Sequence, residues 1–209
     1  MLGLSPTDLI ARLITLVVAL SVHEFAHAWT ADQLGDDTPR LQGRLTLNPL
    51  AHLDPLGSLM LVLVGFGWAR PVVVNPYQLQ RRSPAAMMLV AVAGPFSNLL
   101  MAIIAAIPFR AGLLSLGFSP SFTAELLAQF IFINLLLMFF NLIPISPLDG
   151  EKVADYFLPP GGQRFLDRIR PYGPFLLLAL IFLGSFGGLD LLGNLVGKPA
   201  LSIFRLLIT

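Results

Sequence analysis

Hydrophobic residues along the chain gather into long runs that are separated by short polar stretches. Three of these runs, residues 9–31, 85–108 and 124–145, are each long enough to cross the apolar core of a bilayer as a helix, which takes about 20 residues. A fourth apolar run, residues 56–67, is too short to cross and is typical of a re-entrant or interfacial segment. The pattern predicts an all-α polytopic membrane protein.

The polar stretches between these runs predict loops and a few short elements. Residues 31–55 are rich in Gly, Pro, Asn and Asp, which favour turns, and Val72–Val74 lies between prolines as a short, β-like extended piece. After a polar connection, residues 172–208 are expected to form a C-terminal helical hairpin. The sequence has no internal repeat, so we interpret residues 1–209 as one membrane domain with its core at residues 9–150.

The composition supports this class of protein and excludes several kinds of chemistry. Hydrophobic residues make up 56% of the chain and charged residues 12%, which is about half the share usual in soluble domains. The net charge of +1 gives no electrostatic reason to expect a nucleic-acid partner. The lack of cysteine excludes disulfides, thiolate catalysis and cysteine-ligated zinc. The N-terminus has neither a basic region nor a small-residue cleavage site, so we expect residues 1–30 to be mature structure.

The positive charges indicate how the spans are oriented. Of the 13 Lys and Arg residues, nine fall in two groups, one before the second span and one after the third: Arg40, Arg44, Arg70, Arg81 and Arg82, and Lys152, Arg164, Arg168 and Arg170. If residues 56–67 do not cross the membrane, both groups lie on one face. The positive-inside rule then predicts that this face is cytoplasmic.

Two histidines and a glutamate interrupt the first apolar run, in the sequence HEFAH at residues 23–27. On a helix, His23 and His27 lie one turn apart on the same face and can bind one metal ion, with Glu24 beside the open coordination position. This is the H-E-x-x-H arrangement of zinc peptidases, in which the glutamate is the general base. The alternative is that three polar residues near a helix end are merely hydrogen-bonded to their neighbours. The cost of ionisable groups in lipid favours the metal site.

A catalytic zinc requires a third protein ligand, which must come from His52 or an acidic residue. Asp149 is the best candidate because it follows a long apolar run and two prolines, although it could instead cap a short helix. His23, His27 and Asp149 can meet only if an even number of spans separates them. The metal site therefore also predicts that residues 56–67 do not cross.

Three motifs in this order, HEFAH, GPFSN at residues 94–98 and NLIPISPLDG at residues 141–150, resemble the site-2 protease family of intramembrane zinc metallopeptidases. The stretch GRLTLNPLAHLDPLGSL, followed by GWARPVVVNP, looks like the compact branch of the family that lacks a PDZ domain. The resemblance implies a helical core with one zinc bound by His23, His27 and Asp149, and Glu24 as the catalytic base. The main departure is Ser146, where the family often has proline.

Three further polar residues are candidates for supporting roles. Asn141 lies about two turns before Asp149, and Asn98 follows the GP pair of the second span. Either amide could bind a substrate carbonyl or serve as an interhelical hydrogen bond, and the resemblance favours substrate binding. His52 is expected to be a loop histidine bonded to Asp54 or to backbone, and a second-shell role beside the metal is the alternative.

The function expected from these observations is that of a zinc-dependent intramembrane endopeptidase. Its partners would be transmembrane protein or peptide substrates and the lipid bilayer. Its location would be a prokaryotic cell membrane, with the active site near the cytoplasmic face. The alternative is an inactive membrane protein that binds metal or a partner helix through the same groove. A metal transporter is less favoured because the second span offers only Ser97 and Asn98 as a polar path.

Overall fold

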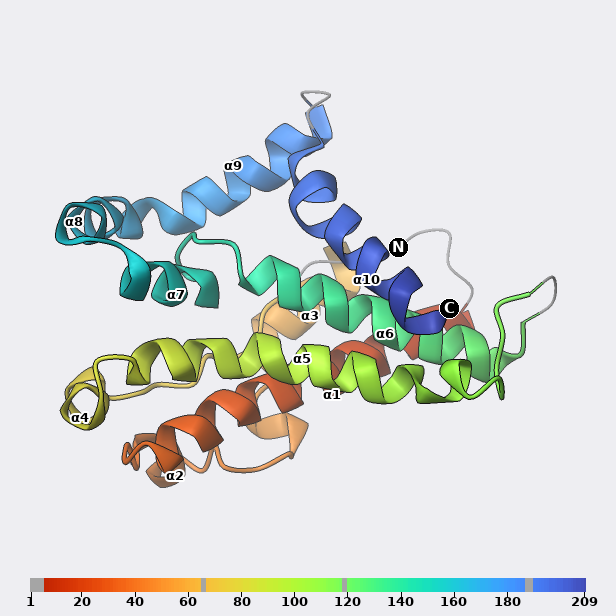
Figure 1. Ribbon diagram of the computed structural model, residues 1–209, viewed down its shortest axis with the longest axis horizontal. Helices are drawn as coiled ribbons and strands as arrows, with labels where there is room; N and C mark the ends of the chain where they lie inside the picture. The colour runs from red at the N-terminus through yellow and green to blue at the C-terminus, as the bar shows by residue number, and fades with distance from the viewer. Residues whose placement is uncertain (1–5, 65–66, 118–119, 187–189) are drawn as a thin grey trace.

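A computed structural model describes residues 6–64, 67–117, 120–186 and 190–209, and these residues form helices joined by loops (Figure 1). The centre of the molecule consists of α1 (Pro6–Gln33), α5 (Ala86–Arg110) and α6 (Phe122–Asn141). Each of these three helices is long and apolar enough to cross a membrane. The structure therefore confirms the all-α polytopic class and the three expected spans.

The central helices pack closely because their facing surfaces carry small residues. Ala102 and Ala106 of α5 are buried against Ala124 and Ala128 of α6 in one apolar cluster. Small side chains let helix backbones approach, which is the usual basis of helix association in lipid. The α6 helix begins at Ser121, whose hydroxyl oxygen accepts a hydrogen bond from the Ala124 amide at 3.2 Å.

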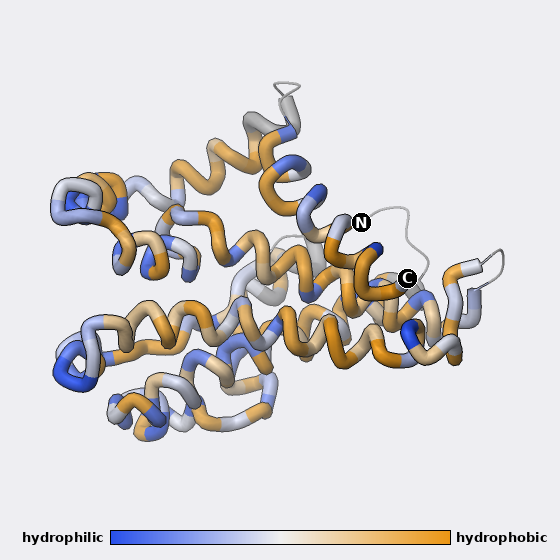
Figure 2. Tube along the Cα trace, viewed as in Figure 1, coloured by the Kyte–Doolittle hydropathy of each residue, from blue (hydrophilic) through white to orange (hydrophobic). Residues whose placement is uncertain are grey.

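The short polar helices gather at one end of the three spans, on the left of Figure 1. Figure 2 shows the hydrophilic residues concentrated at the same end. These helices are α2 (Thr38–Leu41), α4 (Pro76–Arg82), α7 (Asp149–Phe157) and α8 (Pro160–Ile169). Six members of the two positive groups predicted to share a face lie on these helices, and therefore at the same end of the molecule: Arg40, Arg81, Arg82, Lys152, Arg164 and Arg168.

The segment between the first two spans does not cross the molecule. Its helix α3 (Pro55–Val64) has 10 residues and is about 15 Å long, which is half of what a bilayer core requires. A 3₁₀ turn, η1 (Pro49–Ala51), precedes it, and a single antiparallel bridge between Leu53 and Ala69 joins its two flanks. Residues 70–75 are neither helix nor strand, so in the described part of the chain the β-like character expected here is limited to that bridge.

Both helices of the expected C-terminal hairpin are present, but they diverge. Following the 3₁₀ turn η2 (Arg170–Tyr172), α9 (Gly173–Phe186) leads away from α7, and residues 187–189 lie outside the described residues. A π-helical turn, η3 (Gly193–Gly197), then leads into α10 (Lys198–Ile208). Here α10 packs along α6 and not against α9, with the Phe204 ring edge-on to Phe132 (Figure 1).

Candidate metal centre

His23 and His27 lie one turn apart in the second half of α1, and both are buried. Their Nε2 atoms are 3.0 Å apart, as the i, i+4 spacing on one helix face predicts. At 1.5 Å per residue, His27 lies about 9 Å inside the end of α1, and His23 about 15 Å. The pair therefore lies within the candidate membrane span Leu9–Gln33.

Asp149 approaches this pair from α7, which follows α5 and α6 in the chain. Its Oδ2 atom is 3.2 Å from His23 Nε2 and 3.3 Å from His27 Nε2. Asp149 is the first residue of α7, the N-cap position is Leu148, and the Asp149 side chain makes no capping hydrogen bond. The structure thus brings together the three expected metal ligands, and the capping alternative does not describe this aspartate.

Two glycines allow the three ligands to meet. A Cβ atom on Gly94 of α5 would lie 2.4 Å from His27 Nε2 and 2.6 Å from His23 Nε2, so only a glycine leaves room for the imidazoles. A Cβ atom on Gly150 would lie 2.2 Å from the Leu142 carbonyl oxygen, because the first turn of α7 packs directly on the end of α6. The glycines of the GPFSN and LDG motifs therefore have a packing role at the site.

The hydrogen bonds at the Nδ1 atoms determine the tautomer of each histidine. The Nδ1 atom of His27 is 2.7 Å from the Val90 carbonyl oxygen, which can only accept, so His27 carries its proton on Nδ1. The Nδ1 atom of His23 is 2.7 Å from Asn98 Oδ1, with the same consequence. Both Nε2 lone pairs then point toward Asp149 Oδ2. Three electron-pair donors converge, an arrangement that a cation among them would stabilise.

The residues fit a zinc ion. Ligands about 2.0–2.1 Å from a tetrahedral zinc are separated by about 3.3 Å, close to the 3.0, 3.2 and 3.3 Å found here. Asp149 Oδ2 is buried and accepts no hydrogen bond, which leaves it available as a ligand. Two histidines and one carboxylate form a catalytic type of zinc site.

Glu24 is held beside this centre by the loops that flank α3. Its Oε2 atom accepts a hydrogen bond from the Val72 amide at 3.2 Å and lies 4.0 Å from an Arg44 guanidinium nitrogen. Arg44 is buried and donates to the carbonyl oxygens of Ala51 and Arg70, which ties the two loops together. The sequence pattern gave Arg44 only a role in topology, because nothing along the chain relates it to Glu24.

The three remaining candidate residues lie outside the ligand cluster. Asn98 is fully buried, and its amide is occupied by His23 and by Asn134, so it sits behind a ligand and not on a surface open to substrate. Asn141 is partly exposed and donates to the Leu137 carbonyl oxygen at 3.0 Å. His52 is buried with Nε2 2.7 Å from the Thr46 carbonyl oxygen, a backbone partner as expected for a loop histidine.

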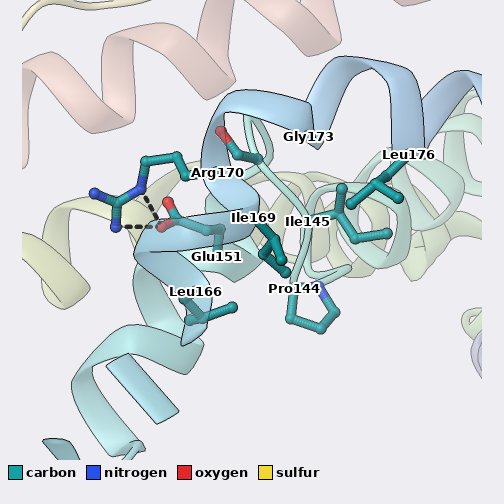
Figure 3. Close-up of a pocket in the computed structure, with 9 residues that line it drawn as sticks. Pro144, Ile145, Glu151, Leu166, Ile169, Arg170, Gly173 and Leu176 are labelled. Atoms are coloured by element: carbon teal, nitrogen blue, oxygen red, sulfur yellow. Dashed lines mark hydrogen bonds and ion pairs between the residues drawn. The ribbon is translucent and has the colours of Figure 1, made fainter. Parts of the chain in front are cut away.

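A buried ion pair anchors α7 next to the centre (Figure 3). Glu151 is 1% exposed, and its Oε1 accepts from Arg170 Nε at 2.8 Å and from an Arg170 guanidinium nitrogen at 2.5 Å, while Lys152 pairs with Oε2. Figure 3 shows this pair beside a small pocket lined by Pro144 and Leu176. Because Glu151 is two residues from Asp149, the contact fixes the helix that carries the third ligand.

Fold and site together define a polytopic helical membrane protein with a His–His–Asp centre suited to a metal ion. A Bacillus subtilis protein with the name "Putative zinc metalloprotease YwhC" is 41% identical over 186 residues, which cover 83% of this chain and 81% of that protein. Proteins named "Putative zinc metalloprotease Rip2" from Mycolicibacterium smegmatis and Mycobacterium tuberculosis are 30% and 31% identical. The chain belongs to the site-2 protease family.

The coverage of these relatives differs. The matches span 79% and 82% of this chain but only 64% and 66% of the two Rip2 proteins, so the chain spans about two thirds of their length. No family model matches the chain, and no solved structure gives a significant match.

Proposed function

We propose that the protein is a zinc-dependent endopeptidase that hydrolyses peptide bonds within or near the transmembrane segments of substrate proteins. The observation that carries the proposal is the convergence of His23, His27 and Asp149 beside Glu24, inside a helix that can cross a membrane. The zinc metalloprotease names of the relatives support both the metal and the reaction type.

The residues of the chain would divide the work of hydrolysis. His23, His27 and Asp149 would hold the zinc ion, which supplies Lewis acidity toward the scissile carbonyl and the attacking water. Glu24 accepts the proton of that water and returns it to the leaving amine. The Val72 amide and the Arg44 guanidinium hold the Glu24 carboxylate in place beside the ligands.

A transmembrane substrate would have to lose helical structure at the cleavage site, because a helix hides its peptide groups in hydrogen bonds. Residues 70–75, which are neither helix nor strand and include the Val72 amide bonded to Glu24, would supply a backbone edge along which an unwound substrate can pair. Val73 is 56% exposed on this segment. Asn141, partly exposed at the end of α6, is the remaining amide that can bind a substrate carbonyl.

The site is proposed to open toward the cytoplasmic face of a prokaryotic cell membrane. Six members of the two positive groups lie on α2, α4, α7 and α8, at the end of the molecule where α1 and α6 end (Figure 1), and positive charge favours the cytoplasmic side. His23 and His27 lie about 15 and 9 Å before that end of α1, so the bond cut would be inside the membrane near its surface.

The test is Glu24→Gln in purified protein reconstituted into liposomes with a single-span substrate. Glutamine keeps the shape of the side chain but cannot accept the proton, so we expect a full zinc complement and at least a 1,000-fold loss of cleavage, on the order of the loss caused by removing a catalytic acid–base group. Glu125→Gln is the matched control, because Glu125 lies on the exposed first turn of α6.

Cleavage by Glu24→Gln at the wild-type rate would contradict the assignment of the base. A wild-type protein that binds one zinc but cleaves no transmembrane substrate would favour the inactive, metal-binding alternative.

A further inference from the structure

A chain of three hydrogen bonds connects a metal ligand to the backbone of another spanning helix. His23 Nδ1 on α1 is 2.7 Å from Asn98 Oδ1 on α5. Asn98 Nδ2 donates to Asn134 Oδ1 on α6 at 2.9 Å, and Asn134 Nδ2 donates to the Phe130 carbonyl oxygen at 2.9 Å. Both asparagines are fully buried, and the three helices meet at this point.

The direction of this chain is fixed at its far end. The Phe130 carbonyl can only accept, so the NH₂ group of Asn134 must face it and Asn134 Oδ1 must face Asn98. Asn98 then has to turn its NH₂ group toward Asn134 and its oxygen toward His23. Reversing either amide would set two acceptors against each other inside a water-free interior, which costs free energy that nothing compensates.

The consequence falls on the proton of His23. A neutral imidazole carries one proton, and an acceptor at Nδ1 places it there, leaving the Nε2 lone pair free. With the proton on Nε2 instead, the nitrogen of His23 that faces His27 and Asp149 would have no lone pair for a metal. We infer that Asn134 is a positioning residue of the metal centre, which acts through Asn98 to hold His23 in its metal-binding tautomer. The inference rests on the proposed metal site.

The Nδ1 proton is placed by a different acceptor in each of the two histidines. His27 reaches a backbone carbonyl directly, that of Val90 on α5. His23 Nδ1 instead faces Asn98 and is connected to the Phe130 carbonyl on α6 through two amides. A single asparagine would not suffice, because an isolated amide can turn over and offer its NH₂ group to the ring. Asn134 removes that freedom.

The first experiment compares zinc affinity in Asn134→Leu and Asn141→Leu by competition with a chelator. Both asparagines lie on α6 and donate to the carbonyl four residues earlier, at 2.9 and 3.0 Å, but only Asn134 also accepts from Asn98. Loss of an outer partner of a metal-bound histidine costs about 10–100-fold in affinity, so Asn134→Leu should show that loss and Asn141→Leu less than about twofold. Equal affinities in the two variants would overturn the inference.

The second experiment reads the tautomer directly. The chain has 3 histidines, so ¹⁵N-histidine labelling gives a spectrum that single substitutions can assign. In metal-free wild-type protein, we expect the His23 signal of an Nδ1-protonated ring, and in Asn134→Leu a mixture with the Nε2-protonated form. An unchanged His23 signal in Asn134→Leu would contradict the relay. This measurement does not depend on proteolysis, so it remains decisive if the proposed function fails.

A third arm separates positioning from packing. Helicity and thermal unfolding of Asn134→Leu are measured beside the His23 spectrum. Positioning predicts that the substitution changes the His23 tautomer in protein that remains folded. A packing role alone would lower the unfolding temperature and leave the tautomer unchanged, which would overturn the inference. If Asn134→Leu does not fold, zinc affinity is compared in Asn98→Asp and Asn98→Leu. We expect Asn98→Leu to lose zinc, and retention of zinc by that variant would overturn the inference.

Discussion

Replacing Gly94 by alanine tests the geometry of the metal centre more directly than removing a ligand. The added Cβ would lie 2.4 Å from His27 Nε2 and 2.6 Å from His23 Nε2. Atoms in van der Waals contact are about 3.5 Å apart, so each ring must move by about 1 Å. Metal–ligand distances tolerate only about 0.2 Å, so we expect zinc affinity to fall at least 100-fold, the upper range for disturbing a metal centre without removing a ligand.

The fold itself should tolerate this change. Alanine is favoured over glycine within a helix by about 1 kcal/mol, so Gly94→Ala should not weaken α5. Gly161→Ala and Gly197→Ala are matched controls, because a Cβ atom at either position has no heavy atom within 4 Å. The assay is zinc stoichiometry and affinity in purified protein, with helicity and thermal unfolding measured in parallel. One tightly bound zinc in Gly94→Ala would refute the arrangement of His23, His27 and Gly94 described above.

Two further predictions concern the supports of Glu24 and of α7. Arg44→Met should leave zinc content unchanged and lower the cleavage rate about 10–100-fold, a fraction of a full acid–base contribution. The reason is that Glu24 loses its neighbouring positive charge and the two loops lose the contacts that join them. Arg40→Met, which removes an exposed ion pair, is the control, and equal cleavage rates in the two variants would contradict this role of Arg44. Burial raises the pKa of Glu151, but Lys152 and Arg170 outweigh it and lower the pKa below the ordinary 4.5. A lowered pKa gives stability that is present above about pH 4.5 and lost as the pH falls, so Glu151→Gln should flatten the acid branch of unfolding; an unchanged acid branch would contradict it.

The placement of the polar groups explains why so many of the buried ones have partners. His23, Asn98 and Asn134 are 4%, 0% and 0% exposed, inside helices that lipid surrounds. Burying a polar group without a hydrogen-bond partner in that environment costs a free energy of at least about 2 kcal/mol. Each of these side chains is therefore hydrogen-bonded, and the bonds cross from one helix to the next. Function and helix association thus depend on the same contacts.

The sequence by itself determined the class of the protein, the spans and the candidate ligand pair. Hydrophobic run length reports directly on crossing a bilayer, and the four-residue spacing of His23 and His27 is a property of one helix, so neither needs tertiary information. The non-crossing of residues 56–67 also followed, because Asp149 could reach the histidines only with an even number of spans between them.

Only the tertiary structure decided which residues support the centre. The residues that support the motif lie far from it in the sequence. From Glu24, Arg44 is 20 residues away and Val72 is 48, and Asn134 is 111 residues from His23. No local period relates such positions, since their proximity arises from how α1, α5 and α6 pack and how the loops around α3 fold back. For the same reason Asn98 looked like a substrate ligand along the chain and lies behind His23 in space. Local patterns fix which chemical groups are present, and packing fixes what each group touches.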